Sequence, residues 1–130
     1  NYNTYNATQS LKQAALTLKN DLRFLQSKAA NGEKPTGSCD PLTGWAITFS
    51  ANSYSYQANC SGSLTGNPIV IQLTPGVAFS PVPSPNTFMF QVLTRGTSLL
   101  TPLPVVLTGS GRQYTIRVSP SGDISDVGIQ

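Results

Sequence analysis

The sequence contains no histidine, and only five of its 130 residues carry a carboxylate side chain. The absence of histidine excludes a histidine general base, a Ser-His-Asp or Cys-His catalytic site, and a zinc site with histidine ligands. The five acids show neither the dense spacing of a calcium loop nor a pattern that places two carboxylates in one cleft. We therefore expect a protein without catalytic residues, without a cofactor and without a metal site.

Charged residues are also scarce, at 10% of the chain, and long hydrophobic runs are absent. No stretch of about 18 or more apolar residues occurs, so no segment of this sequence is predicted to span a membrane. No basic start followed by an apolar stretch, as in a signal peptide, opens it. Hydrophobic residues make up 38% of the chain, which is enough to form the core of one domain of ordinary size.

The two cysteines, Cys39 and Cys60, flank a predicted β-hairpin that would bring them together. This placement favours a disulfide bond formed in an oxidising compartment, such as the periplasm, the cell surface or the exterior. The low charge and the high serine and threonine content also suit an exported protein. The alternative is a pair of unrelated, reduced thiols in a cytosolic protein.

Residues 8–30 have the periodicity of an amphipathic helix. No proline precedes Pro35, and Gly32 is well placed to cap the C-terminal end of the helix. Apolar residues spaced alternately by four and three positions form one narrow stripe, which needs a sheet or another chain to cover it. The stripe consists of Leu11, Ala15, Leu18, Leu22, Leu25 and Ala29.

After Pro35 the sequence breaks into short runs of alternating apolar and polar residues, separated by glycine and proline. This order predicts an α+β fold, in which a long N-terminal helix packs on an antiparallel β-sheet region. Residues 1–34 form the helical segment and residues 35–130 the β-rich part of one domain. The predicted strands are 44–50, 53–60, 68–73, 77–79, 87–93, 105–108, 113–119 and one short strand near Ile124.

Three segments of the chain resemble one bacterial family. Residues 22–29 resemble its helix, in which a hydrophobic turn with arginine precedes a small and basic stretch. Residues 39–45, with Cys39 and the pair Gly44-Trp45, resemble its first strand, and residues 114–122 its closing strand and turn. Over residues 10–125 the chain thus resembles the soluble part of a type IV pilin-like protein, most closely a minor pilin or an H-type pseudopilin.

The resemblance implies a structural subunit without enzymatic activity, which acts by assembling with other pilin or pseudopilin subunits. The filament would belong to a type IV pilus or a type II secretion-like system, at the periplasmic or extracellular face of the cell envelope. Mature members of this group begin with an apolar helix of about 20 residues, which anchors them in the inner membrane. Residues 1–9 are polar instead, so we expect the gene to encode a basic leader and that apolar segment before Asn1.

The sequence also predicts which residues of the apolar stripe pack within the domain and which contact neighbouring subunits. We expect Leu18, Leu22 and Leu25 to pack on a single sheet face of the same domain. Residues 1–10 lack apolar periodicity and should project beyond the sheet or fray. Leu11 would then find its partners only in neighbouring subunits.

Positive charge gathers on the helical segment. Residues 1–34 carry five cations and two anions, a net charge of +3, whereas residues 35–130 carry three of each. Lys12, Lys19 and Arg23 fall within about 40° of one another around the helix. A solvated flank of the helix is one interpretation, and a contact with another subunit or with a polyanion is the other.

A DNA-uptake or adhesive pilin, whose β-rich part binds DNA or a surface ligand, is the alternative function. Some H-type minor pilins bind DNA through a C-terminal Gly-Arg-x-Arg motif, and here residues 111–114 read Gly-Arg-Gln-Tyr. Arg112 and Arg117 are therefore candidate polyanion contacts, together with the three helix cations. Trp45 alternates with apolar residues on its strand, which favours core packing over stacking on a carbohydrate.

Overall fold

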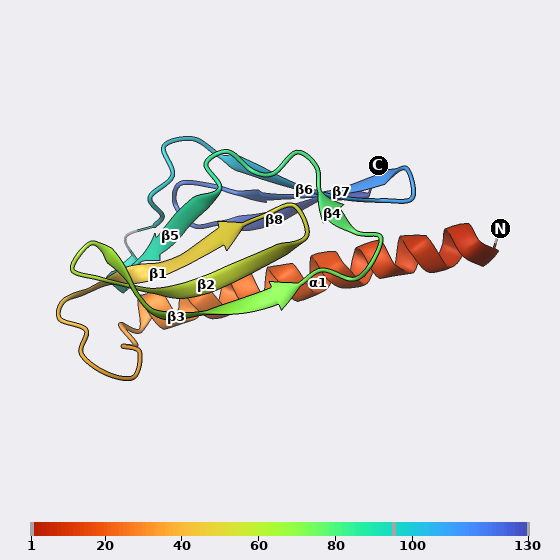
Figure 1. Cartoon of the computed structure of the whole chain (residues 1–130). Coiled ribbons are helices and arrows are strands. Elements are labelled where there is room, and N and C mark those ends of the chain that lie inside the picture. The colour runs from red at the N-terminus through yellow and green to blue at the C-terminus, as the bar shows by residue number, and fades with distance from the viewer. Residues whose placement is uncertain (1, 95, 130) are drawn as a thin grey trace.

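The computed structural model describes residues 2–94 and 96–129. In this part of the chain one long helix precedes eight strands and one 3₁₀ turn (Figure 1). The elements are α1 (Tyr2–Ala30), β1 (Leu42–Phe49), β2 (Ser53–Cys60), β3 (Ser63–Gln72), β4 (Ala78–Phe79), β5 (Thr87–Gln91), η1 (Val92–Thr94), β6 (Leu103–Gly109), β7 (Arg112–Val118) and β8 (Ile124–Ile129).

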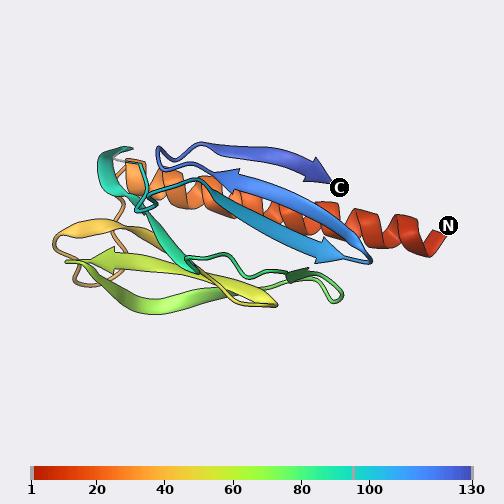
Figure 2. The same ribbon diagram turned by 90° about the horizontal axis from the view of Figure 1, so that it is seen from above.

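The strands form two four-stranded sheets, not the single sheet face that the sequence predicted. Sheet A has the order β3-β2-β1-β5 and sheet B the order β4-β6-β7-β8, and every pairing is antiparallel. The alternation within each strand shows which side of the strand is buried but not which sheet the strand joins, so the division into two sheets could not be predicted. Figures 1 and 2 show α1 running along both sheets, which confirms the predicted α+β fold.

Helix α1 ends as the sequence predicted and begins earlier. Gly32 adopts a left-handed conformation, and the Glu33 N–H donates to the Lys28 carbonyl oxygen at 2.9 Å. A glycine satisfies this C-terminal geometry without steric cost. At the other end the helix starts at Tyr2 instead of residue 8, so residues 2–10 do not fray.

The apolar stripe of α1 is buried along its whole length. Leu11, Leu18, Leu22 and Leu25 are all 0% exposed, and the two stripe alanines are buried as well. The expectation that Leu11 lies outside the domain is therefore wrong. Strand β6 is longer than predicted and β7 begins one residue earlier, and their hairpin reaches Leu11: a Cβ atom added to Gly109 would lie 3.9 Å from Leu11 Cδ1.

The inward faces of both sheets complete the core. The strands that alternate most cleanly place every second side chain against α1, as their patterns indicated. Five aromatic rings with edge-to-face and stacked contacts fill the space under sheet A. They belong to Phe49, Tyr54, Phe79, Phe88 and Phe90, all of which are at most 2% exposed.

Candidate functional site

Sheet A holds the middle of α1 through a buried hydrogen bond. The Tyr54 hydroxyl, on a side chain that is 1% exposed, donates to Asp21 Oδ2 at 2.6 Å. Burial, and then the hydrogen bond to Asp21, raises the pKa of Tyr54 above its ordinary value of 10.0. One turn further along, the ring of Phe24 meets that of Tyr56 edge-on at 6.3 Å. The rotation of α1 about its axis is thereby fixed relative to sheet A.

The raised pKa of Tyr54 predicts a loss of stability in alkaline solution. Below pH 10 the hydroxyl is protonated in both states, so the full stability is present. Above pH 10 the unfolded chain ionises first, and the free energy of unfolding should fall by about 1.4 kcal/mol per pH unit for this one group. Urea denaturation of the wild type and of Tyr54→Phe, from pH 9 upward, measures the difference in slope. Equal slopes for the two proteins would contradict the assignment.

Sheet B holds the helix from the other side. Lys19 Nζ forms an ion pair with Asp126 Oδ2 on β8, and its side chain is 15% exposed. Gln26 Nε2 donates to the Gly122 carbonyl oxygen at 2.7 Å, in the turn between β7 and β8. Gly122 has a φ of 102°, a conformation that residues with a side chain rarely adopt, so the turn needs glycine here. Lys19 is therefore engaged within the domain and is not available to a polyanion.

Lys28, in the last turn of α1, lies between two aromatic rings and connects the helix to β1. Lys28 Nζ lies 5.0 Å from the ring centroid of Phe24 and 4.8 Å from that of Trp45, and 3.8 Å from Glu33 Oε2. The Trp45 indole N–H donates to the Glu33 carbonyl oxygen at 2.9 Å, and the side chain is buried. Trp45 is thus a core residue, as its strand pattern indicated, and the ammonium group gains cation–π contacts.

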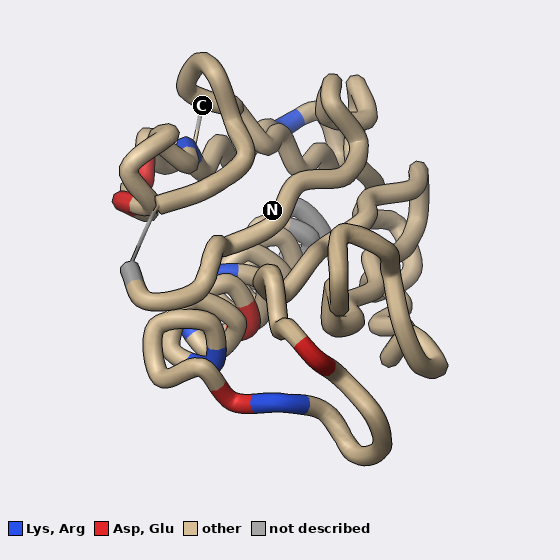
Figure 3. The backbone as a smooth tube through the Cα atoms, turned by 90° about the vertical axis from the view of Figure 1, so that its left-hand side faces the viewer, with Lys and Arg blue, Asp and Glu red and all other residues tan. Residues whose placement is uncertain are grey.

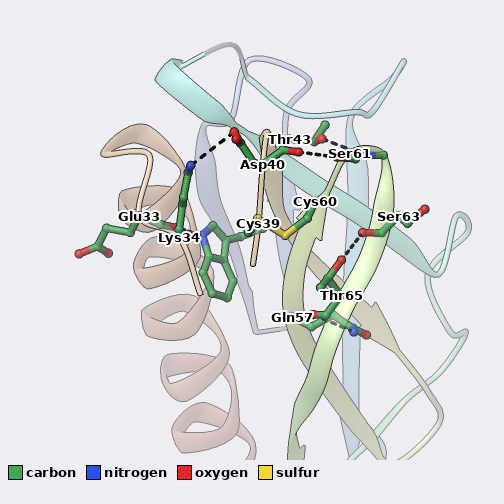
Figure 4. The surroundings of a disulfide bond; sticks show 12 residues. Glu33, Lys34, Cys39, Asp40, Thr43, Gln57, Cys60, Ser61, Ser63 and Thr65 are labelled. Atoms are coloured by element: carbon green, nitrogen blue, oxygen red, sulfur yellow. Dashed lines mark hydrogen bonds and ion pairs between the residues drawn. A yellow bond between two sulfur atoms is a disulfide. The ribbon is translucent and has the colours of Figure 1, made fainter. Parts of the chain in front are cut away.

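The predicted disulfide between Cys39 and Cys60 is present (Figure 4). It joins the loop after α1 to the end of β2, with the two Cα atoms 5.2 Å apart. Ser61 Oγ donates to the Asp40 carbonyl oxygen at 2.9 Å, and the Ser61 N–H donates to the Pro41 carbonyl oxygen at 2.8 Å. The loop that connects helix and sheet is therefore fixed at one covalent point and by two hydrogen bonds.

One face of α1 remains uncovered by either sheet. Lys12 and Arg23 are exposed and form no ion pair within the described residues, and Leu16 between them is 47% exposed. Asn20 and Ser27 complete this surface, which we call the free helix face. The two cations of this face were identified from the sequence, but Leu16 was not. The spacing of apolar residues indicates only the side of the helix that is buried, and Leu16 does not belong to that side.

The five candidate polyanion contacts do not form one surface. Lys12 and Arg23 lie on the free helix face, and Lys19 is paired with Asp126. Arg112 and Arg117 lie on β7, where the alternate residues, among them Ile116 and Val118, face the helix. Arg117 therefore points to the outside of sheet B, away from the helix cations.

The acidic groups are dispersed in the same way. Asp21 accepts from Tyr54, whereas Glu33, Asp40 and Asp126 each lie near a different lysine. Across residues 2–94 and 96–129 no group of three or more cysteine and carboxylate side chains could hold a metal ion. Within the same residues no helix combines the length and the hydrophobicity needed to cross a membrane.

Comparison with known families identifies one family that matches most of the chain. The family model described as type II transport protein GspH matches residues 14–122, which is most of the chain. The matched part begins on α1 and ends in the turn before β8. No significant match was found among curated proteins, and none among solved structures.

Proposed function

The chain belongs to the family of the type II transport protein GspH, and from this premise we propose that it is a pseudopilin subunit that acts by assembling into a filament. It would be a structural protein without enzymatic activity. Its partners would be other pseudopilin or pilin subunits at the cell envelope. A secretion filament fits the family description better than a pilus does.

The observation that carries this proposal is the position of α1 relative to the sheets. The helix starts at Tyr2, and its first turns run past the ends of the strands (Figures 1 and 2). Residues 2–10 correspond to roughly 13 Å of helix. A helix that extends from its own domain in this way can pack against the same helix of a neighbouring subunit. A membrane anchor before Asn1, as the sequence resemblance implies, would continue it in the same direction.

The free helix face supports the same role. Lys12 and Arg23 flank Leu16, so the face offers one apolar contact between two cations with no intramolecular partner among the described residues. An acidic or polar groove on a neighbouring subunit would complement it. DNA uptake, the alternative, is less well supported, because the exposed cations are divided between two surfaces and few phosphates could be neutralised together.

Charge reversal on the free helix face tests the proposal. In the full-length protein, produced in its native host, the double variant Lys12→Glu with Arg23→Glu should lower the yield of sheared filaments about fivefold or more, because the two introduced carboxylates would repel an acidic partner. Immunoblotting of the sheared fraction measures the yield. The matched control is Arg117→Glu, which changes an exposed arginine on the outside of sheet B and should leave the yield unchanged.

The folded domain must be intact in each variant for this test to be informative. The exchanged side chains are exposed, so thermal unfolding of the purified domains should be the same within error. Normal filament yield from the double variant would overturn the proposal that this face joins subunits. Loss of yield from Arg117→Glu alone would place the contact on the outside of sheet B instead.

A further inference from the structure

Strand β3 is an open sheet edge. It pairs with β2 on one side, and no segment of the described chain pairs with its other side. The remaining edges are protected, as is usual in native sheets. Strand β4 has two residues, and β8 carries Asp126, which is paired with the helix. Strand β5 is covered by the segment after η1: the Gln91 N–H donates to the Gly96 carbonyl oxygen, and the Ser98 N–H donates to the Met89 carbonyl oxygen.

Neither β3 nor the rest of sheet A carries any charge. No charged residue occurs from Pro41 to Thr94, a range that contains all four strands of the sheet. Figure 3 shows the charged residues confined to the other parts of the chain. Charged side chains are the usual means by which an edge strand repels another strand. Sheet A therefore lacks this protection at its longest exposed edge.

The part of β3 that can accept a strand is short and well defined. The register against β2 shifts between Tyr56 and Ala58, which leaves residues 66–68 in a bulge. Ile69–Gln72 beyond the bulge is regularly paired. Ile69 and Ile71 are paired with Tyr56 and Tyr54 and face the helix side, whereas Val70 faces outward. Ile69 and Val70 are 52% and 53% exposed. An added strand would pair with this regular stretch.

Two hollows lie beside this stretch at the spacing of alternate side chains. A groove of about 360 Å³ is lined by Ile69, Tyr56 and the last turn of α1. A smaller hollow of about 180 Å³ is lined by Ile71, Tyr54 and Thr17. Residues two apart on a strand are separated by about 7 Å and point to the same face. Inward side chains of an added strand would therefore enter the two hollows in turn.

The larger groove is basic at its rim. Lys28 and Lys34 both line it, and their ion pairs within the domain are long, at 3.8 Å to Glu33 and 3.6 Å to Asp40. Asp40 is 87% exposed, so its pairing with Lys34 contributes little. A carboxylate entering the groove would find two ammonium groups. The smaller hollow is uncharged, and Ala14, Ile71 and Leu73 form the part of its lining that an aliphatic side chain would contact.

We propose that β3 is a docking site for an extended segment of a partner protein, which adds a strand to sheet A and places an acidic side chain in the groove beside Ile69 and an aliphatic one in the hollow beside Ile71. Backbone hydrogen bonds to the open edge supply affinity, and the two hollows supply specificity. A second copy of this chain fits less well, because its β3 carries no acidic residue. This inference goes beyond the filament role and does not depend on it.

Peptide titration of the purified domain tests the proposal. The probes are short capped peptides of serine and threonine that contain glutamate and valine separated by one residue, in both orders, since a strand adds parallel or antiparallel. We expect one order to shift the backbone amide resonances of β3 and of α1 near Lys28, and not those of β8. A peptide with lysine in place of glutamate should bind about fivefold more weakly or worse.

Charge reversal at the larger groove distinguishes recognition of the peptide's glutamate from backbone hydrogen bonding to β3 alone. Lys34→Glu should weaken binding of the glutamate peptide about fivefold, whereas Lys12→Glu, on the free helix face, should leave it unchanged. Equal binding of the glutamate and lysine peptides, or shifts spread over both sheets, would overturn the proposal. So would a concentration-dependent dimer that the β3 variant Val70→Lys abolishes, since the occupant would then be a second copy.

Discussion

Replacing Leu11 by alanine is expected to destabilise the isolated domain by about 2–5 kcal/mol. Leu11 is 0% exposed, the same as Leu22, and it lies near Gly109 at the far end of the β6–β7 hairpin. Removing its branched end leaves a cavity between the helix and sheet B that neither rigid element can close. Leu22→Ala, in the middle of the helix, should cost a similar amount. Chemical denaturation of the purified domains gives both values.

Leu16→Ala is the matched control for Leu11→Ala. Leu16 is on the same helix, one turn away, and is 47% exposed, so its truncation should cost less than about 0.5 kcal/mol. A cost for Leu11→Ala as small as that of Leu16→Ala would contradict the burial of Leu11. It would also restore the division of the stripe that the sequence suggested, with Leu11 reserved for neighbouring subunits.

Loss of the disulfide is the second large effect that we expect. Converting Cys39 and Cys60 to serine should lower the free energy of unfolding by about 3 kcal/mol, because the unfolded chain is no longer closed into a loop. The sequence separation of the two cysteines is 21 residues. The folded state should keep its sheets, since the two hydrogen bonds from Ser61 to Asp40 and Pro41 still hold the loop. Thermal unfolding should show a midpoint lower by about 10 °C.

Reduction of the wild type offers an independent check on the disulfide. The reduced wild type should unfold at nearly the same temperature as the double serine variant, and adding reductant to the variant should change nothing. If reduction left the unfolding midpoint of the wild type unaltered, the loop after α1 would be held by its hydrogen bonds and not by the covalent bond.

The elements with strong periodicity were predictable from the sequence. The helix stripe, the strands around Trp45 and Phe88, and the disulfide all followed from spacing and residue type. Strand β3 was placed five residues too late, because the turn before it was not identified. Ser61 and Gly62 both have positive φ angles, of 56° and 84°, and close β2 directly onto β3. This two-residue turn fixes where β3 begins.

The surfaces that matter for binding were the least predictable part. The free helix face depends on which side of α1 the two sheets leave open, and the division into two sheets is a long-range property. The open edge of β3 depends on sheet order, which no local pattern specifies. Even the uncharged stretch from Pro41 to Thr94 acquires a meaning only when the fold shows that it holds all of sheet A.

Site-specific photo-cross-linking at Leu16 tests the central claim, that the chain assembles into a filament through its helix. The full-length protein carries a photoreactive residue in place of Leu16, or in place of Val127 on β8 as the exposed control. In the native host, we expect covalent adducts with other filament subunits from position 16, recovered in the sheared fraction, and far fewer from position 127. A protein that stays monomeric at position 16, or that forms its subunit adducts only from position 127, would contradict the account.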